Sequence, residues 1–330
     1  MRITIAEARR LVEAAMRAAG QSQDEAAIIA DHLIDCELRG VQFGGLPRAL
    51  SILERLARST RPRGPIRVVR DTPVSALVEG GDQVGYLVAH RATTIAIDKA
   101  KASGIGMVAA NDTWYTGMFS YYMEMATRES LVAMAIGNAS PRVAPFGSTE
   151  GRFGTNPIAF GFPSADSPVI WDIGTSAIMA GEVALAQRLG QELPPGVAFD
   201  RDGNPTRDPG KAGEGAYASW GGYKGSGLAM MVQLMGMMCG TLPFPPLVAG
   251  CGYLIMVVRP DLFMSTEVFK ARVAEYSQAV RAAKPIDADK PTRMPFDRSV
   301  TERQRRLAED AIEVAESVHA RLKDAADQRT

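Results

Sequence analysis

Histidine and cysteine are scarce in this 330-residue sequence, which contains three of each. The cysteines, Cys36, Cys239 and Cys251, are odd in number and lie in apolar segments, which argues against a disulfide framework and indicates packed thiols. No two of them have CxxC spacing, and the histidines are scattered along the chain. A metal site therefore has little support.

An excess of charge of either sign is also missing. Thirty-seven basic residues balance thirty-seven acidic ones, so no overall field draws the chain toward nucleic acid or anionic lipid. The longest apolar stretch, around Leu228–Met238, is too short to cross a bilayer, and the N-terminus lacks the apolar core of a signal peptide. We therefore expect a cytoplasmic protein without nucleic-acid or membrane partners.

Two helices are predicted at the N-terminus, each introduced by a capping box in which a hydroxyl and a glutamate three residues later satisfy free amides. The pairs are Thr4 with Glu7 and Ser22 with Glu25. A third pair, Ser299 with Glu302, begins a tail that has helical spacing to about residue 322. The tail is expected to return as one helix, packing on the N-terminal pair.

Between these ends the pattern becomes mixed. A third helix runs from Pro47 to about Ala57, and the basic stretch Arg58–Pro65 marks a boundary. Short apolar runs then alternate with helical periodicity, which indicates an α/β layer. From Val132 to Asp172 the strands are separated by glycine- and proline-rich loops, and Asp200–Gly215 is polar and rich in turn residues. The length favours two or three folding units.

Three glycine-bearing segments are candidate binding loops. In Gly154–Pro157 (GTNP) the backbone amides and the Thr155 hydroxyl are suited to phosphate or carboxylate oxygens, although an ordinary tight turn has the same composition. The run Asp172–Ser176 suits a ribose or phosphate contact, or a capped helix start. In Gly221–Gly227 the small residues admit a ligand to the backbone, and Lys224 can neutralise its charge just before a predicted helix.

These segments are neither the GxGxxG dinucleotide fingerprint nor the GxxxxGK[ST] phosphate loop, and neither pattern is complete in a strand-turn-helix setting elsewhere. A standard Rossmann or ATPase assignment is therefore weak.

The order of motifs resembles the malate/L-lactate dehydrogenase family, whose members include keto-acid, ureidoglycolate and cyclic-imine dehydrogenases. The first motif, RGVxSHGxxR, is similar to Arg39–Arg48. The later motifs match in order and cover nearly the whole chain: GTNP with Ile158-Ala159-Phe160, Asp172–Ser176, Pro205–Pro209 and Tyr223-Lys224-Gly225.

The resemblance implies an α/β fold unlike the Rossmann fold. It places a helical domain in residues 1–62 plus 290–330, a small α/β domain in 63–118 and an NAD(P)-binding domain in 119–289. It also implies a homodimer with its active site near the subunit boundary, and NAD or NADP as cofactor. The implied cofactor contacts are Asp172, Ile173, Gly174, Thr175, Ser176, Tyr223, Lys224 and Gly225.

The first motif departs from the family pattern at its catalytic positions. Without a gap, Phe43 stands where the family has serine and Gly44 where it has the proton-donating histidine. Arg48 is retained, and its implied role is a charge-assisted clamp on the substrate carboxylate, helped by Thr155. A surface salt bridge is the ordinary alternative for such an arginine.

A second motif, NSxHxGxxGYY, resembles residues 112–122, with Tyr115 in place of its histidine. A phenol donates a proton when a nearby cation or hydrogen bond supports its anion, so Tyr115 or a bound water is the candidate general acid. Alternatively, Trp114 and Tyr115 stack on the nicotinamide or reshape the pocket. Glu182 falls near a position that supplies a supporting carboxylate in some members, or is an exposed helix residue.

The leading hypothesis is reversible hydride transfer between NAD(P)H and a carbonyl or imine carbon of a small carboxylate-bearing substrate, a 2-oxo or 2-hydroxy acid or a cyclic imino acid. A second hypothesis is a non-catalytic nucleotide-binding scaffold, because fold resemblance does not guarantee a retained reaction. A third is a related enzyme that uses a different acid on an unusual substrate, which explains the aromatic residues at 43, 114 and 115.

Overall fold

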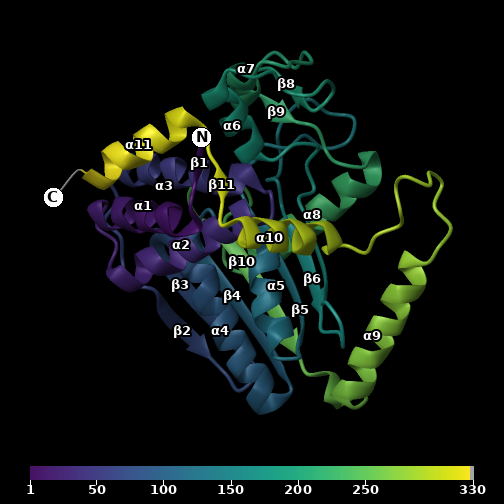
Figure 1. The fold of residues 1–330 in the computed structure, drawn as a ribbon. Helices are drawn as coiled ribbons and strands as arrows, with labels where there is room; N and C mark the ends of the chain where they lie inside the picture. The colour runs from purple at the N-terminus through teal and green to yellow at the C-terminus, as the bar shows by residue number, and fades with distance from the viewer. Residues whose placement is uncertain (328–330) are drawn as a thin grey trace.

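The two ends of the chain form one helical unit. The computed structural model describes residues 1–327, and Figure 1 shows the C-terminal helix lying beside the N-terminal ones. Its helices are α1 (Ile5–Ala18), α2 (Gln23–Leu38), α3 (Leu46–Arg58) and α11 (Glu316–Asp327). Ile29, Leu33, Ile52 and Leu322 meet in their common core. A short strand β1 (Arg2–Ile3) pairs antiparallel with β11 (Ile312–Glu313).

One of the three predicted capping boxes, Ser22 with Glu25, is complete, and Thr4 forms half of a second. The Thr4 hydroxyl accepts from the Glu7 amide, and Ser22 and Glu25 bond reciprocally. The third prediction was wrong, because α10 (Asp297–Glu309) begins before Ser299.

The prediction of a single C-terminal helix was also wrong. Asp310, with φ 43°, ends α10 in the left-handed region, and the chain continues as β11 before α11. Ile312 and Val314 are buried on either side of exposed Glu313, an alternation that fits the strand paired with β1. The apolar residues of the tail also have helical spacing, so a helix was predicted. The strand that pairs with β11 lies at the other end of the sequence and could not be recognised as its partner.

A seven-stranded sheet forms the body, in the order β2-β3-β4-β10-β5-β6-β7. Its strands are β2 (Arg67–Asp71), β3 (Ser75–Val84), β4 (Ile105–Trp114), β5 (Val132–Asn138), β6 (Ile158–Phe162), β7 (Val169–Ile173) and β10 (Cys251–Val258). Only β3 and β4 are parallel, whereas every other neighbouring pair is antiparallel. The expected α/β class without a Rossmann fold is confirmed, because a Rossmann sheet is mostly parallel.

Helices cover both faces of this sheet. Alternate residues Tyr253 and Ile255 of β10 pack with α4 (Gly85–Ser103) and α5 (Phe119–Arg128), while Leu254 faces α8 (Gly222–Met238). The sheet and this core run across the predicted boundary between 63–118 and 119–289, because β4 bonds to β10. No helix within residues 1–327 is long and apolar enough to span a membrane.

A small lobe and two further helices complete the fold. The lobe packs around Val143, Phe153, Val183 and Tyr217. Its elements are α6 (Ala180–Leu189), β8 (Ala198–Phe199), α7 (Pro209–Glu214) and β9 (Ala216–Tyr217). Two 3-10 turns, η1 (Gln42–Gly44) and η2 (Pro260–Leu262), precede α3 and α9 (Thr266–Arg281).

A buried ion cluster joins the helical unit to the sheet. Arg39, 0% exposed at the end of α2, donates to Asp35 at 2.6 Å and to Glu124 of α5 at 2.8 Å. Arg303 of α10 reaches the same two carboxylates. Three elements far apart in the sequence are thereby held at one point. All three cysteines are buried free thiols, as expected.

Replacement of Arg39 by methionine is predicted to lower the free energy of unfolding by about 3 kcal/mol, because it removes the fully buried cation from Asp35 and Glu124 and leaves them only the more exposed Arg303 and Arg128. Urea denaturation measures the loss. Arg2→Met, which removes an exposed pair with Glu309, is the control and is expected to cost about 1 kcal/mol or less. An equal, small loss in both variants would contradict the structural role of Arg39.

Candidate active site

Three candidate binding loops meet at Thr175, which is fully buried. Its amide donates to the Thr155 carbonyl at 2.9 Å, and its hydroxyl lies 3.2 Å from the carbonyls of Thr155 and Asn156. Its own carbonyl accepts from the Trp220 amide at 3.0 Å, just before Gly221–Gly227. The structure therefore brings GTNP, Asp172–Ser176 and the start of α8 together.

Asn156 fixes the GTNP loop to α8. Its backbone is left-handed, with φ 36°, and its side chain is fully buried. The side-chain amide donates to Ala229 and Gln233 of α8 at 2.9 Å, and its oxygen accepts from the Ala139 amide. The contacts of Asn156 with α8 thus fix the conformation of this loop. The composition of the loop alone does not reveal these contacts.

The Arg48 guanidinium lies over the ring of Tyr115. Arg48 comes from the first turn of α3 and Tyr115 follows β4, and the guanidinium carbon is 4.5 Å from the ring centroid. Within residues 1–327 no carboxylate lies within 4.0 Å of the Arg48 guanidinium, whereas Arg39, Arg55 and Arg188 are all paired. The half-buried Arg48 is thus a cation available to an external anion.

The start of α6 packs against Arg48 and Phe43. A Cβ placed on Gly181 would overlap both the Arg48 guanidinium and the Phe43 ring, so only glycine admits this contact. Glu182, next along, is exposed, and its carboxylate accepts from the Met179 amide at 2.8 Å, capping α6. A Cβ on Gly44 would lie 3.3 Å from Cys36 Sγ, so position 44 faces α2.

His32 holds the turn that carries Tyr115. The turn is strained, because Tyr115 has φ 51° in the left-handed region. His32 Nε2 accepts from the Met118 amide at 2.8 Å, and its ring packs against Tyr86. Burial lowers the pKa of His32 to about 3, so this acceptor is neutral at physiological pH. Sequence reasoning missed His32, because only the fold brings α2 to this turn.

Tyr86 is a second residue that the sequence did not single out. It lies at the start of α4, is 2% exposed and packs edge-on against His32 at a centroid distance of 4.6 Å. Burial raises the pKa of its hydroxyl, and the positive charge of Arg48 opposes part of that rise. Tyr86 therefore forms part of the wall behind Arg48 and Tyr115.

The run Asp172–Ser176 is occupied largely by internal contacts. Asp172 accepts from the amide and hydroxyl of Ser120 at 2.7 and 2.8 Å and so caps α5. Burial raises the pKa of its carboxyl, while these bonds oppose the rise. Ile173 is half-buried at the end of β7, Gly174 packs against Met179, and the Ser176 hydroxyl donates to Ile178 O at 2.7 Å.

The first turn of α8 is open to solvent. Tyr223 and Lys224 are exposed, and Gly221 and Gly222 take φ values near 60° that permit the tight entry into the helix. A Cβ on Gly225 would overlap the Trp220 carbonyl. Within the described part of the chain, Lys224 has no carboxylate within 4.0 Å. Its ammonium and the helix amides thus form one positively charged turn.

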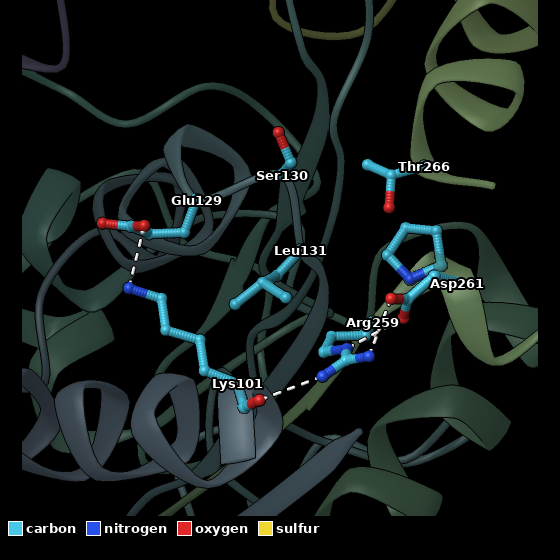
Figure 2. A pocket seen from close by; sticks show the side chains of 8 residues that line it. Lys101, Glu129, Ser130, Leu131, Arg259, Asp261 and Thr266 are labelled. Atoms are coloured by element: carbon cyan, nitrogen blue, oxygen red, sulfur yellow. Dashed lines mark hydrogen bonds and ion pairs between the residues drawn. The ribbon is translucent and has the colours of Figure 1, made fainter. Parts of the chain in front are cut away.

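A separate shallow pocket lies at the other end of β4 from Tyr115. It has a volume of about 230 Å³, and Figure 2 shows that its charged side chains pair with one another. Lys101 bonds to Glu129 at 2.8 Å, and Arg259 to Asp261 at 2.7 Å. Because these charges pair with one another, the pocket presents no unpaired cation comparable to Arg48.

Known proteins match this chain over nearly its whole length. The model of the malate/L-lactate dehydrogenase family matches residues 3–323. The malate/(S)-sulfolactate dehydrogenase of Methanothermus fervidus is 31% identical, covering 99% of this chain and 98% of its own. The NAD(+) ureidoglycolate dehydrogenase of Escherichia coli O157:H7 is 28% identical, with 98% and 95% covered.

A solved structure agrees with these sequence matches. The delta1-piperideine-2-carboxylate reductase of Pseudomonas syringae pvar. tomato superposes with a TM-score of 0.86 at 28% identity, covering 98% of this chain and 99% of its own. The agreement extends over both the helical unit and the sheet. The chain belongs to the malate/L-lactate dehydrogenase family.

Proposed function

We propose that this chain catalyses reversible hydride transfer between NAD or NADP and the carbonyl or imine carbon of a small carboxylate-bearing acid. The names of its relatives support this substrate class. Malate and (S)-sulfolactate are 2-hydroxy acids, and delta1-piperideine-2-carboxylate is a cyclic imine with a carboxylate. In each case an anionic group lies beside the carbon that gains or loses hydrogen.

The unpaired Arg48 guanidinium is the observation on which the proposal depends. A guanidinium binds a carboxylate through two parallel hydrogen bonds, which fixes the orientation of the acid as well as its position. Thr155 is the proposed second contact. Arg39, Arg55 and Arg188 already have carboxylate partners, whereas Arg48 packs on Tyr115 without one and is the proposed partner of a substrate anion.

The residues around α8 fit a dinucleotide. The pyrophosphate carries negative charge, and the first turn of this 17-residue helix presents free amides together with Lys224. Thr175 places the neighbouring loop within the same region. Hydride transfer is the chemistry that a nicotinamide supplies when bound, and the chain's residues bind and orient the reactants.

Tyr115 is the proposed proton donor. As hydride reaches the carbon, its hydroxyl delivers a proton to the carbonyl oxygen or imine nitrogen, and takes it back in the reverse direction. The contact between its ring and Arg48 supports this role, because an acid bound by Arg48 would lie beside the ring. In the competing role, Tyr115 only shapes the pocket. Glu182 supports catalysis indirectly in this proposal, by capping the helix that packs on Arg48.

A homodimer is the proposed assembly, in the cytoplasm. Met230, Met231, Leu234 and Met238 are exposed on α8, with Leu234 at 52%. Contiguous exposed apolar side chains of this kind indicate a contact surface. Since the same helix begins with Tyr223 and Lys224, a second copy packed on α8 would lie close to the cofactor loops.

Replacement of Arg48 by lysine is predicted to raise the KM for the acid about 10- to 100-fold, because one charge-assisted hydrogen bond worth about 1.5–3 kcal/mol is lost. The assay follows reduced nicotinamide absorbance with 2-oxo acids, 2-hydroxy acids and cyclic imino acids. The exposed Arg58→Lys at the end of α3 is the control. Cofactor binding without turnover of any of these acids would favour the non-catalytic scaffold.

Removal of the Tyr115 hydroxyl in Tyr115→Phe is predicted to lower kcat about 100-fold or more, the usual contribution of a general acid. KM should stay nearly constant, because the ring on Arg48 is retained. Tyr276→Phe, on the exposed part of α9, is the control. An unchanged kcat across the pH range would remove Tyr115 from the acid role.

The double variant Met231→Glu/Leu234→Glu is predicted to be monomeric, because two charges on an apolar contact surface repel and resist desolvation. Light scattering after size exclusion measures the mass. Val268→Glu places the same charge on the exposed face of α9 and should leave the mass unchanged. A monomeric wild-type protein would refute the homodimer.

A further inference from the structure

A buried carboxyl supports the loop that carries Arg48. Glu37, in the last turn of α2, is 2% exposed. Its Oε1 accepts from the Leu46 amide at 2.7 Å. The same carboxyl packs directly on Gly45, where a Cβ would overlap it. Glu37 therefore touches both residues at the junction of η1 and α3.

This contact replaces a helix cap. The N-cap position of α3 is Gly45, which has no side chain to bond the first free amide. Glu37 supplies the missing acceptor from a different helix. The Arg48 amide in turn donates to the Gly45 carbonyl at 2.9 Å. The start of α3, and with it Arg48, is held in place through the Glu37 carboxyl.

The surroundings of the carboxyl favour its neutral form. Its second oxygen, Oε2, is buried and has no hydrogen-bond partner among the described residues. Arg306 of α10 donates to the Glu37 carbonyl rather than to the carboxylate. An ionised carboxylate with one unsatisfied buried oxygen is costly, because nothing replaces the lost hydration.

Charged, titratable and hydrogen-bonding groups approach Glu37 from three elements. They are Cys36 on α2, Arg306 on α10 with its ion-pair partner Glu302, and the backbone amide of Leu46 on α3. Burial raises the pKa of Glu37 to about 7, while the Leu46 hydrogen bond and the Arg306 charge oppose the rise. Ionisation therefore begins in the physiological range.

We propose that Glu37 is a positioning residue for substrate binding, which holds Arg48 in place as a neutral acid and releases the start of α3 when it ionises. The substrate part rests on the proposed function. The segment packed on the carboxyl contains Gly44 and Gly45 beside the solvent-exposed Gln42, so its displacement would expose the carboxyl to water.

The direction with pH follows from the raised pKa. A carboxyl titrates near 4.3 in an unfolded chain, and here it titrates near 7. The held arrangement is therefore fully favoured below the unfolded pKa and is lost as pH rises through about 7. Substrate affinity and protection of the loop should both fall between pH 6 and pH 8.

Hydrogen exchange of the peptide covering residues 42–50 tests this without substrate. After correction for the intrinsic exchange rate, opening in the wild type should be about 10-fold more frequent at pH 8 than at pH 6, one unit either side of the pKa. Glu37→Gln keeps an acceptor for the Leu46 amide and cannot ionise, so its opening should be constant. The exposed Glu129→Gln is the control and should follow the wild type.

Kinetics test the link to Arg48. The wild-type KM for the acid should rise over the same range with kcat little changed, by less than the change in opening because it follows the fraction of molecules whose loop is closed, whereas Glu37→Gln should show a flat KM. Glu37→Ala should have a raised KM at every pH, because it leaves the Leu46 amide unsatisfied.

A wild type whose loop opening does not change with pH, or a Glu37→Gln variant that follows the wild-type profile, overturns the proposal. If Glu37→Gln does not fold, the wild-type exchange profile still decides. If loop opening changes with pH as predicted but no acid is turned over, the proposed function is wrong while the role of Glu37 in holding the loop stands.

Discussion

The buried Arg39 cluster is the constraint on which the arrangement depends. One guanidinium, fully removed from water, joins α2 to α5, while Arg303 brings α10 to the same carboxylates. Because Arg39 lies three residues before η1, a shift of α2 against the sheet would displace both Phe43 and Arg48. The two arginines of the first motif thus differ in their contacts: the leading one joins the helices to the sheet, and the last one lies unpaired on Tyr115.

The site combines rigid support with unsatisfied charge. Tyr115 occupies a backbone region that costs about 1 kcal/mol or more for a residue with a side chain, and His32 holds the turn that carries it. The neighbouring polar groups Asp172 and Thr175 are satisfied internally. Arg48 is the exception. An internally bonded frame around an unpaired cation is the arrangement expected of a preorganised anion site.

Local signals predicted much of the fold, and contacts distant in sequence account for the failures. Thr4 and Ser22 obey capping rules that act within one helical turn, so their helices could be located from the sequence. The residues that would contact ligand were proposed from ordered motifs. Glu37 and His32 were missed, because each binds a backbone amide, of Leu46 or Met118, on another element. The tail was misassigned because β11 pairs with residues 2–3.

The central position of β10 affects how this chain is made. Strand β10 (residues 251–258) lies between β4 and β5, which precede it in the sequence by more than a hundred residues. During synthesis, both earlier strands therefore emerge with an unpaired hydrogen-bonding edge, and such edges recruit other chains. The sheet closes only when three quarters of the polypeptide exists. A ribosome-bound fragment of this protein is thus prone to aggregation, and chaperones have a long interval in which to protect it.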